Sequence, residues 1–400
     1  MRARIQVCFL VVSGALAATG CSSSPSKAGP SDAAAVDVVT SDAAADGPVD
    51  ASTGDAAADG PTDPSRLQPP PAGQGLQMKT DAFAVAPGTE VQSCYFFRVS
   101  DLAQAAGFAA NQPIDVHRVQ VVQKAGSHHM NVFRVRTIKG LDPANGAVQV
   151  GTNGQGQCFV SSNWSDWPLV TNTQQAGDQD WSYPDGVANQ LNPADHPDEW
   201  LMLQTHYVNA STQGTPGGTG QVAINLWTLP ADQVTAQIGT LFATDQSIRV
   251  CQSNPKPTFK ASCQFNSPNP VTIIGANGHF HSRGVEFDMF TWDGTSTTTP
   301  PDSSRFYQSL TWDSPPMLHS PDLNVSVPSG GGVWYTCSYD WVAPVASVGC
   351  AGLNAFDQTK YGTPASQQDC CYTFGPQVDK NEHCNAFVYY YPKQDNVTCF

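Results

Sequence analysis

Short β-type runs constrain the fold of this 400-residue chain more than any other feature. From about residue 77 onwards the runs are rich in Val, Ile, Thr, Phe, Tyr and Trp, and Gly, Pro, Asn and Asp divide them. Such runs are typical of strands, and helical periodicity extends only over residues 101–110. The sequence therefore predicts an all-β protein built from tandem, jelly-roll-like β-sandwiches. The clearest runs are 94–99, 116–123, 130–137, 200–208, 222–229, 285–292, 332–339 and 386–391.

The N-terminal end has the features of an export signal. Arg2 and Arg4 precede a largely apolar stretch that ends at Ala18, so residues 1–20 are predicted to be a signal peptide. The following Thr19-Gly20-Cys21 resembles a bacterial lipoprotein cleavage box with Cys21 as the lipid-bearing residue. We expect an exported, lipid-anchored protein in the periplasm or on the cell surface, with ordinary signal cleavage as the alternative.

Residues 21–76 are predicted to form a disordered tether. This segment consists mainly of Ala, Asp, Gly, Pro and Ser, and it has eight Asp between Asp32 and Asp63. With so few large apolar residues it cannot bury enough surface to offset its conformational entropy. The rest exceeds the usual size of one domain, so we expect two sandwiches, at 77–229 and 230–400. The boundary is placed at Leu229-Pro230, after a run that is typical of a closing strand.

The charge balance excludes one class of partner. The chain has 34 acidic and 19 basic residues, a net charge of −15. Because it lacks a basic stripe, we do not expect it to bind nucleic acid. The membrane is expected to be reached only through the lipid anchor.

Cysteine usage predicts a disulfide framework. Ten of the twelve cysteines remain once Cys8 and Cys21 are set aside, and an even number in an exported chain favours up to five bridges. The sequence has no CxxC pair, which argues against a zinc ribbon. Adjacent Cys370 and Cys371 should take separate partners. Cys251 is expected to pair either with Cys263 or with Cys399.

The histidines supply the candidate chemistry. His279 and His281 share one face of a strand, as two ligands of one metal ion must, although two solvated histidines would give the same pattern. His128 and His129 are adjacent, so both can bind one ion only at a bend or bulge. His206 lies in an apolar run, where a lone histidine is more often a hydrogen-bonded core residue.

Four segments containing these histidines occur in an order typical of one family. They are His128-His129-Met130, Leu203-Gln204-Thr205-His206-Tyr207, Gly278-His279-Phe280-His281 and Glu382-His383-Cys384-Asn385. In these motifs the chain resembles the copper type II, ascorbate-dependent monooxygenases, the family of peptidylglycine α-hydroxylating monooxygenase and dopamine β-monooxygenase. The resemblance covers about residues 89–392.

The resemblance implies two β-sandwich domains, each holding one copper ion, across a solvent-filled cleft. His128, His129 and His206 would form the electron-transfer copper site. His279 and His281 would bind the oxygen-binding copper. Cys337 and Cys384 resemble a disulfide pair of the second domain, whereas Cys94 with Cys158 is a guess because the family's first-domain pattern is not kept.

The sequence also departs from the family pattern. His383 stands where the oxygen-binding copper has a methionine, and a third imidazole is a harder ligand that should favour Cu(II). Met317 is a possible soft substitute outside the matching segments. Asn277 replaces the arginine that binds a carboxylate in peptide-hydroxylating members, and an amide cannot make that charge-assisted contact. Asn385 is kept and Phe387 replaces a tyrosine, so the predicted substrate pocket of Asn277, Asn385 and Phe387 suits a weakly polar small molecule better than a peptide.

Three functions follow from these features. The first is a copper monooxygenase that hydroxylates a C–H bond with O2 and ascorbate or another one-electron donor; His279, His281 and His383 would form its catalytic site. The second is a non-catalytic extracytoplasmic copper-binding protein on the same fold. The third is a β-sandwich binder with structural histidines. His117, His196 and His319 match no family position, and the Cys350–Cys371 insert is predicted to be a disulfide-stapled loop that can roof the site.

Overall fold

The computed structural model describes residues 63–135, 148–152, 168–175, 177–197, 199–209, 218–353, 369–375 and 377–400. The signal peptide, Cys21 and most of the predicted tether lie outside the described residues. The folded part nevertheless begins before residue 77. Pro64–Arg66 form a 3-10 helix (η1), and the carbonyls of Leu67 and Gln68 accept hydrogen bonds from Gln77 and Asn225. The predicted tether boundary is therefore too late.

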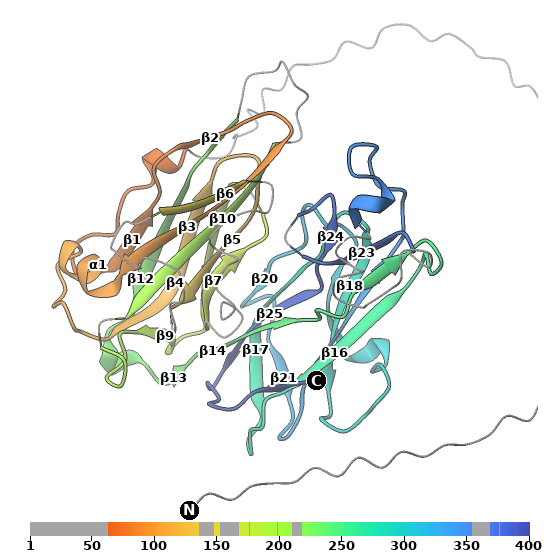
Figure 1. The fold of residues 1–400 in the computed structure, drawn as a ribbon. Coiled ribbons are helices and arrows are strands. Elements are labelled where there is room, and N and C mark those ends of the chain that lie inside the picture. The colour runs from red at the N-terminus through yellow and green to blue at the C-terminus, as the bar shows by residue number, and fades with distance from the viewer. Residues whose placement is uncertain are drawn as a thin grey trace, which may run out of the picture. The chain divides into compact units, whose positions relative to one another are not determined.

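The first sandwich consists of two main sheets (Figure 1). One has the order β1 (Gly75–Lys79), β12 (Val222–Thr228), β4 (Ile114–Gln123), β9 (Val187–Leu191) and β13 (Ala236–Gln237), with β8 (Gly177–Ser182) beside β4. The other has the order β6 (Val148–Thr152), β3 (Thr89–Arg98), β10 (Trp200–Asn209), β5 (Ser127–Arg134) and β7 (Leu169–Thr173). A separate two-stranded sheet consists of β2 (Phe83–Val85) and β11 (Gly218–Gly220), and α1 (Val99–Ala105) follows β3.

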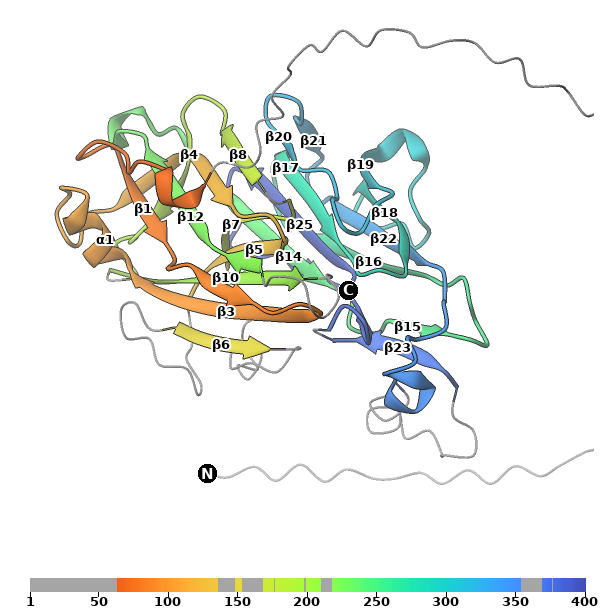
Figure 2. The same ribbon diagram turned by 90° about the horizontal axis from the view of Figure 1, so that it is seen from above.

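The second sandwich has two five-stranded sheets and a smaller one (Figure 2). The first sheet contains β14 (Gly239–Thr244), β25 (Asn385–Tyr391), β17 (Val271–His279) and β20 (Leu318–His319), with β21 (Val325–Val327) beside β17. The second has the order β19 (Arg305–Ser309), β18 (Gly284–Trp292), β22 (Gly332–Tyr339), β16 (Thr258–Gln264) and β26 (Thr398–Cys399). The small sheet consists of β15 (Arg249–Cys251), β23 (Cys371–Phe374) and β24 (Asn381–Glu382).

This topology confirms the all-β sandwich prediction and shifts the internal boundary. Strand β13 pairs in parallel with β9 of the first sandwich, whereas β14 pairs with β25 of the second. The chain therefore passes from one sandwich to the other between Gln237 and Gly239, later than the predicted Leu229-Pro230. A sequence cannot show this because a two-residue strand has too few residues to display an alternating pattern.

Strands β5 and β7 are buried along their whole length, unlike strands of a sheet with one wet face. One face packs on the core of the first sandwich, which includes Val132 and Leu203. Residues of the second sandwich, among them Ile274 and Tyr389, belong to the same apolar cluster. The sheet that carries β5 and the sheet that carries β17 therefore pack against each other through apolar side chains.

Four disulfides lie in the second sandwich: Cys251–Cys371, Cys263–Cys399, Cys337–Cys384 and Cys350–Cys370. They confirm the Cys337–Cys384 pair, the separate partners of Cys370 and Cys371, and the stapled insert. Both predicted partners of Cys251 are wrong, because β15 lies beside β23 and brings Cys251 to Cys371. Cys94 is disulfide-bonded, and Cys158 lies outside the described residues. These bonds are typical of an oxidising, extracytoplasmic compartment.

None of the helices in the described part of the chain combines the length and apolar character needed to cross a membrane.

Gly278 is required by close packing in β17, and this gives a test of the fold. A Cβ atom added at Gly278 would lie 2.6 Å from the Phe287 ring of the facing sheet. Because Phe287 is fully buried, we expect Gly278→Ala to destabilise the protein by about 1–3 kcal/mol in urea unfolding. Gly352→Ala is the control, since its added Cβ would meet only Val348 at 3.4 Å. Equal stability of the two variants would contradict the packing described.

Candidate metal centre

The first three histidines come from neighbouring strands. His129 of β5 lies opposite His206 of β10, and the register then skips His128, so that Tyr207 faces Ser127. This bulge confirms the predicted irregularity at the His128-His129 doublet. It allows two adjacent side chains to reach one place, with ring centroids 5.3 Å apart. The His129 and His206 rings are 4.9 Å apart.

The second three histidines meet at the end of β17. His279 is the last residue of that strand, His281 follows it, and His383 lies between β24 and β25. The rings of His279 and His281 are 5.2 Å apart, and those of His281 and His383 are 4.2 Å apart. The structure thus brings His383 together with His279 and His281.

The two sets form one cluster that spans both sandwiches. The His279 ring lies 4.9 Å from the His128 ring and 4.9 Å from the His129 ring. All six side chains are buried, and none of the six residues is more than 9% exposed. The family resemblance implied two copper sites across a solvent-filled cleft. In this structure the packed sheets replace that cleft with direct contact between the two sets of rings.

Hydrogen bonds from outside the cluster hold some of the rings. His206 Nε2 contacts Glu90 Oε2 at 3.1 Å, and His281 Nδ1 contacts the Asn381 carbonyl at 3.0 Å. Within the cluster, His206 Nδ1 lies 3.2 Å from His129 Nε2, and His279 Nε2 lies 3.0 Å from His383 Nδ1. The Glu90 carboxylate and the Asn381 carbonyl can only accept, so His206 Nε2 and His281 Nδ1 carry the hydrogen.

Three buried ring nitrogens of the cluster have no hydrogen-bond partner among the described residues: His128 Nε2, His279 Nδ1 and His281 Nε2. The same three residues can each offer a ligand atom within 4.8 Å of the other two. Leaving buried polar atoms unpaired is costly, and a bound metal ion would satisfy all three. Imidazole donors suit copper or zinc, whereas calcium and magnesium prefer oxygen ligands. The three imidazole nitrogens therefore fit copper, the metal that the sequence predicts.

Burial keeps five of the histidines uncharged. Desolvation, reinforced by neighbouring histidines, lowers the pKa of His128, His129, His279 and His281 well below the ordinary value of 6.5. The same cause lowers the pKa of His383 to about 3. Neutral imidazole is the form that binds metal, so the site is ready for an ion at neutral pH.

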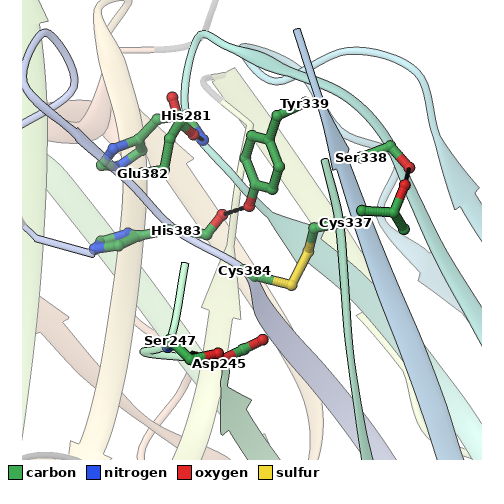
Figure 3. The surroundings of a disulfide bond; sticks show 10 residues. Asp245, Ser247, His281, Cys337, Ser338, Tyr339, Glu382, His383 and Cys384 are labelled. Carbon is green, nitrogen blue, oxygen red and sulfur yellow. Dashed lines mark hydrogen bonds between the residues drawn. A yellow bond between two sulfur atoms is a disulfide. The ribbon is translucent and has the colours of Figure 1, made fainter. Parts of the chain in front are cut away.

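A buried ion pair positions the second set. Glu382 accepts hydrogen bonds from the backbone N–H groups of His281 and Arg283, at 3.0 and 3.1 Å, and from the Arg283 side chain. Figure 3 shows Glu382 beside His281, with the Tyr339 hydroxyl donating to the His383 carbonyl and the Cys337–Cys384 disulfide next to it. Sequence reasoning missed Arg283 and Glu382, although both lie within two residues of a predicted ligand.

A cavity of about 320 Å³ opens beside His129, His279 and His383. Asn385 and Phe387, two of the predicted pocket residues, line it. The remaining lining is aromatic and amide in character: Gln92, Asn131, Gln174, Gln204, Phe242, Phe374, Gly375 and Asn381. Phe374 to Asn381 follow the stapled insert along the chain, so the segment after Cys371 forms part of the cavity wall. The cavity suits a small, weakly polar molecule.

Asn277 lies outside this cavity lining. Its side chain donates to Asn172 at 3.2 Å and accepts from it at 2.8 Å, and Tyr389 also donates to Asn172. Asn277 is fully buried between the two sandwiches, where it joins them instead of facing a substrate. Its position in β17 next to the HxH motif does not reveal this, because the partner is 105 residues away in sequence.

The other histidines lie apart from the cluster. His117 contacts the Val187 carbonyl at 3.0 Å, and the His196 side chain is 56% exposed, as expected for a loop residue. His319 stacks on Trp181 with ring centroids 4.3 Å apart and, together with Met317, lines a different cavity. Met317 therefore shares that second cavity and not the wall formed by His279 and His383.

Comparisons with known proteins give no family. No protein-family model matches the chain, and no curated protein matches it. Among solved structures it is similar to a chain of the Cowpea mosaic virus top component, the naturally occurring empty particles, at 7% identity and a TM-score of 0.26. That match covers 87% of this chain and 98% of the viral chain. A similarity this low carries no argument about fold or function.

The lowered histidine pKa values predict a steep acid dependence of stability in metal-free protein. Unfolded histidines take up protons near pH 6.5, whereas the folded His383 resists protonation down to about pH 3. The unfolded state therefore binds more protons in this window, and stability falls as the pH is lowered from 6.5 towards 3. Each buried histidine should add up to about 1.4 kcal/mol per pH unit. Urea unfolding from pH 7 to 4 measures this dependence of stability on pH. His383→Gln removes one of the buried histidines and should make the slope less steep, whereas His196→Gln should leave it unchanged. A flat profile in the unsubstituted protein would contradict the buried, neutral cluster.

Breaking the Arg283–Glu382 pair should destabilise the centre strongly. Arg283→Met leaves a buried carboxylate without its cation, and we expect a loss of about 3–5 kcal/mol in urea unfolding. Arg118→Met is the matched control, because its partner Asp180 is 43% exposed and an exposed pair contributes less than about 1 kcal/mol. Equal losses in the two variants would refute the structural role of the buried pair.

Proposed function

We propose that the protein is an extracytoplasmic copper-dependent monooxygenase, anchored by a lipid at Cys21, that hydroxylates a C–H bond of a small organic molecule. The net reaction joins substrate, O2, two electrons and two protons to give the hydroxylated product and water. Ascorbate or another one-electron donor would supply the electrons. The observation that carries this proposal is a cluster of six buried histidines, five of them kept neutral by burial, beside a cavity lined by aromatic and amide side chains.

The six histidines would hold two copper ions, which supply redox chemistry with O2 when bound. The neutral rings offer lone pairs without first losing protons. Burial keeps water away from the reacting atoms, so a reactive species formed there is protected from side reactions. Asn385 and Phe387 line the cavity next to His279 and His383, where they would orient the substrate.

The character of the cavity favours the substrate class. Phe242 stacks on Phe387 with ring centroids 4.8 Å apart, which gives one wall a flat apolar surface. The amides of Gln204 and Asn385 provide hydrogen bonds on other parts of the lining. Because the described residues of the lining include no arginine or lysine, the cavity is poorly suited to a substrate carboxylate. A neutral aromatic or alkyl molecule with one or two polar groups fits best.

A second candidate is a copper-binding protein without catalysis. His383 provides the observation in its favour, since an all-imidazole ligand set is harder than one with methionine and holds Cu(II) well. In this alternative the cavity would be empty space beside a storage or delivery site. The two functions differ in whether O2 consumption yields a product.

Oxygen uptake by copper-loaded protein distinguishes them. With ascorbate and a panel of phenethyl, aryl and alkyl compounds, we expect uptake coupled to a hydroxylated product. His281→Ala removes a proposed ligand and should reduce the rate by more than the ~10–100-fold that loss of a supporting hydrogen bond costs. His196→Ala, an exposed loop change, should leave the rate unchanged. Peroxide or no uptake across the panel would support the binding protein instead.

A further inference from the structure

We infer that one metal ion is shared between the two sandwiches, bound by His128 from the first and by His279 and His281 from the second. An ion at this site would stabilise the interface between the two sandwiches. The inference rests on the metal-binding part of the proposed function and is independent of oxygen chemistry. It assigns His128 differently from the family resemblance, which groups His128 with His129 and His206.

The unpartnered nitrogens carry this assignment. His128 Nε2, His279 Nδ1 and His281 Nε2 are buried and lack a hydrogen-bond partner among the described residues. Ligand atoms of these residues lie within 4.8 Å of one another. Two nitrogens that each bind an ion at about 2.1 Å can be no more than about 4.2 Å apart. The rings thus need only a small rotation to close on an ion.

Supporting hydrogen bonds agree with this choice of atoms. The Asn381 carbonyl can only accept, so His281 Nδ1 carries the hydrogen and Nε2 keeps its lone pair. With His279 donating through Nε2–H to His383 Nδ1, the His279 Nδ1 atom keeps the lone pair that would bind the ion. Glu382 binds the His281 backbone N–H and fixes this part of the chain. The second sandwich therefore offers two metal-binding nitrogens, His279 Nδ1 and His281 Nε2, near His128.

The remaining nitrogens suggest where a second ion would bind. His129 Nε2 and His206 Nδ1 lie 3.2 Å apart in the first sandwich. Glu90 contacts His206 Nε2 and favours a hydrogen on that nitrogen. The lone pair of His206 Nδ1 is then the one that can bind a metal ion. This pair belongs to one sandwich alone. Its ion would not depend on how the two sandwiches are docked.

Direct contacts already join the two sandwiches. Asn172 and Asn277 exchange two hydrogen bonds, Trp181 stacks on His319, and Gln175 donates to the Pro315 carbonyl at 3.0 Å. Each contact joins the first sandwich to the second. An ion that binds only the docked arrangement must stabilise it in proportion to its own affinity. The shared site would therefore couple metal loading to the integrity of the interface.

The test uses Zn²⁺, which has no redox activity, and two double variants of the full folded protein. In His129→Gln/His206→Gln the shared site is intact, and one tightly bound Zn²⁺ is expected by calorimetric titration. Adding His128→Gln to this background should weaken binding by more than the ~100-fold upper range for a supporting contact. In His279→Gln/His281→Gln the shared site is lost, and adding His128→Gln should leave residual Zn²⁺ binding unchanged.

The family grouping predicts the reverse pattern in the two backgrounds, and that result would overturn the inference. Adding His196→Gln serves as the neutral control in both. Thermal unfolding of each metal-free variant shows whether it folds, and Zn²⁺ should raise the melting temperature of the first background only while His128 is present. None of these readouts involves O2, so they can support the shared site even if the protein is not a monooxygenase. If the shared site is refuted, oxygen uptake still tests the monooxygenase proposal separately.

Discussion

Packing of the sheet that carries β5 and β7 against the sheet that carries β17 and β25 is the interaction on which the rest of the structure depends. It buries both faces of β5, so every residue of that strand, including His128 and His129, lies inside the protein. It also removes water from the six histidines, which lowers the pKa of most of them. Burial without charge is what makes the cluster a candidate metal centre.

Supports outside the cluster make such burial tolerable. Arg283 and Glu382 form a buried ion pair that also satisfies backbone groups around His281, so the pair does not leave isolated charges. The Cys337–Cys384 disulfide and the Tyr339 hydroxyl fix the chain next to His383. These groups position donors and have no need to touch a substrate. Their arrangement explains how His279, His281 and His383, which come from two separate segments, can share one small volume.

The contact between the two histidine sets changes how the centre is understood. Separate copper sites across water would have to exchange electrons over a distance, whereas here the rings of His128 and His279 are neighbours. Any ions held by this cluster would be close together and would share the burial of the interface. The cavity reaches His129 as well as His279 and His383, so a bound molecule would contact both sets.

The sequence by itself determined the main strands and the sandwich class, because alternating runs are local properties. The Cys337–Cys384 pair and the set of six candidate histidines came from the family resemblance of short motifs. The skipped register at His128 was also foreseeable, since adjacent strand residues otherwise face apart. Only the tertiary structure decided that the two sets merge, that Asn277 pairs with Asn172, and that Cys251 bonds to Cys371. Each of these depends on which sheet faces which, and long-range packing between residues a hundred positions apart leaves no periodic trace in the chain.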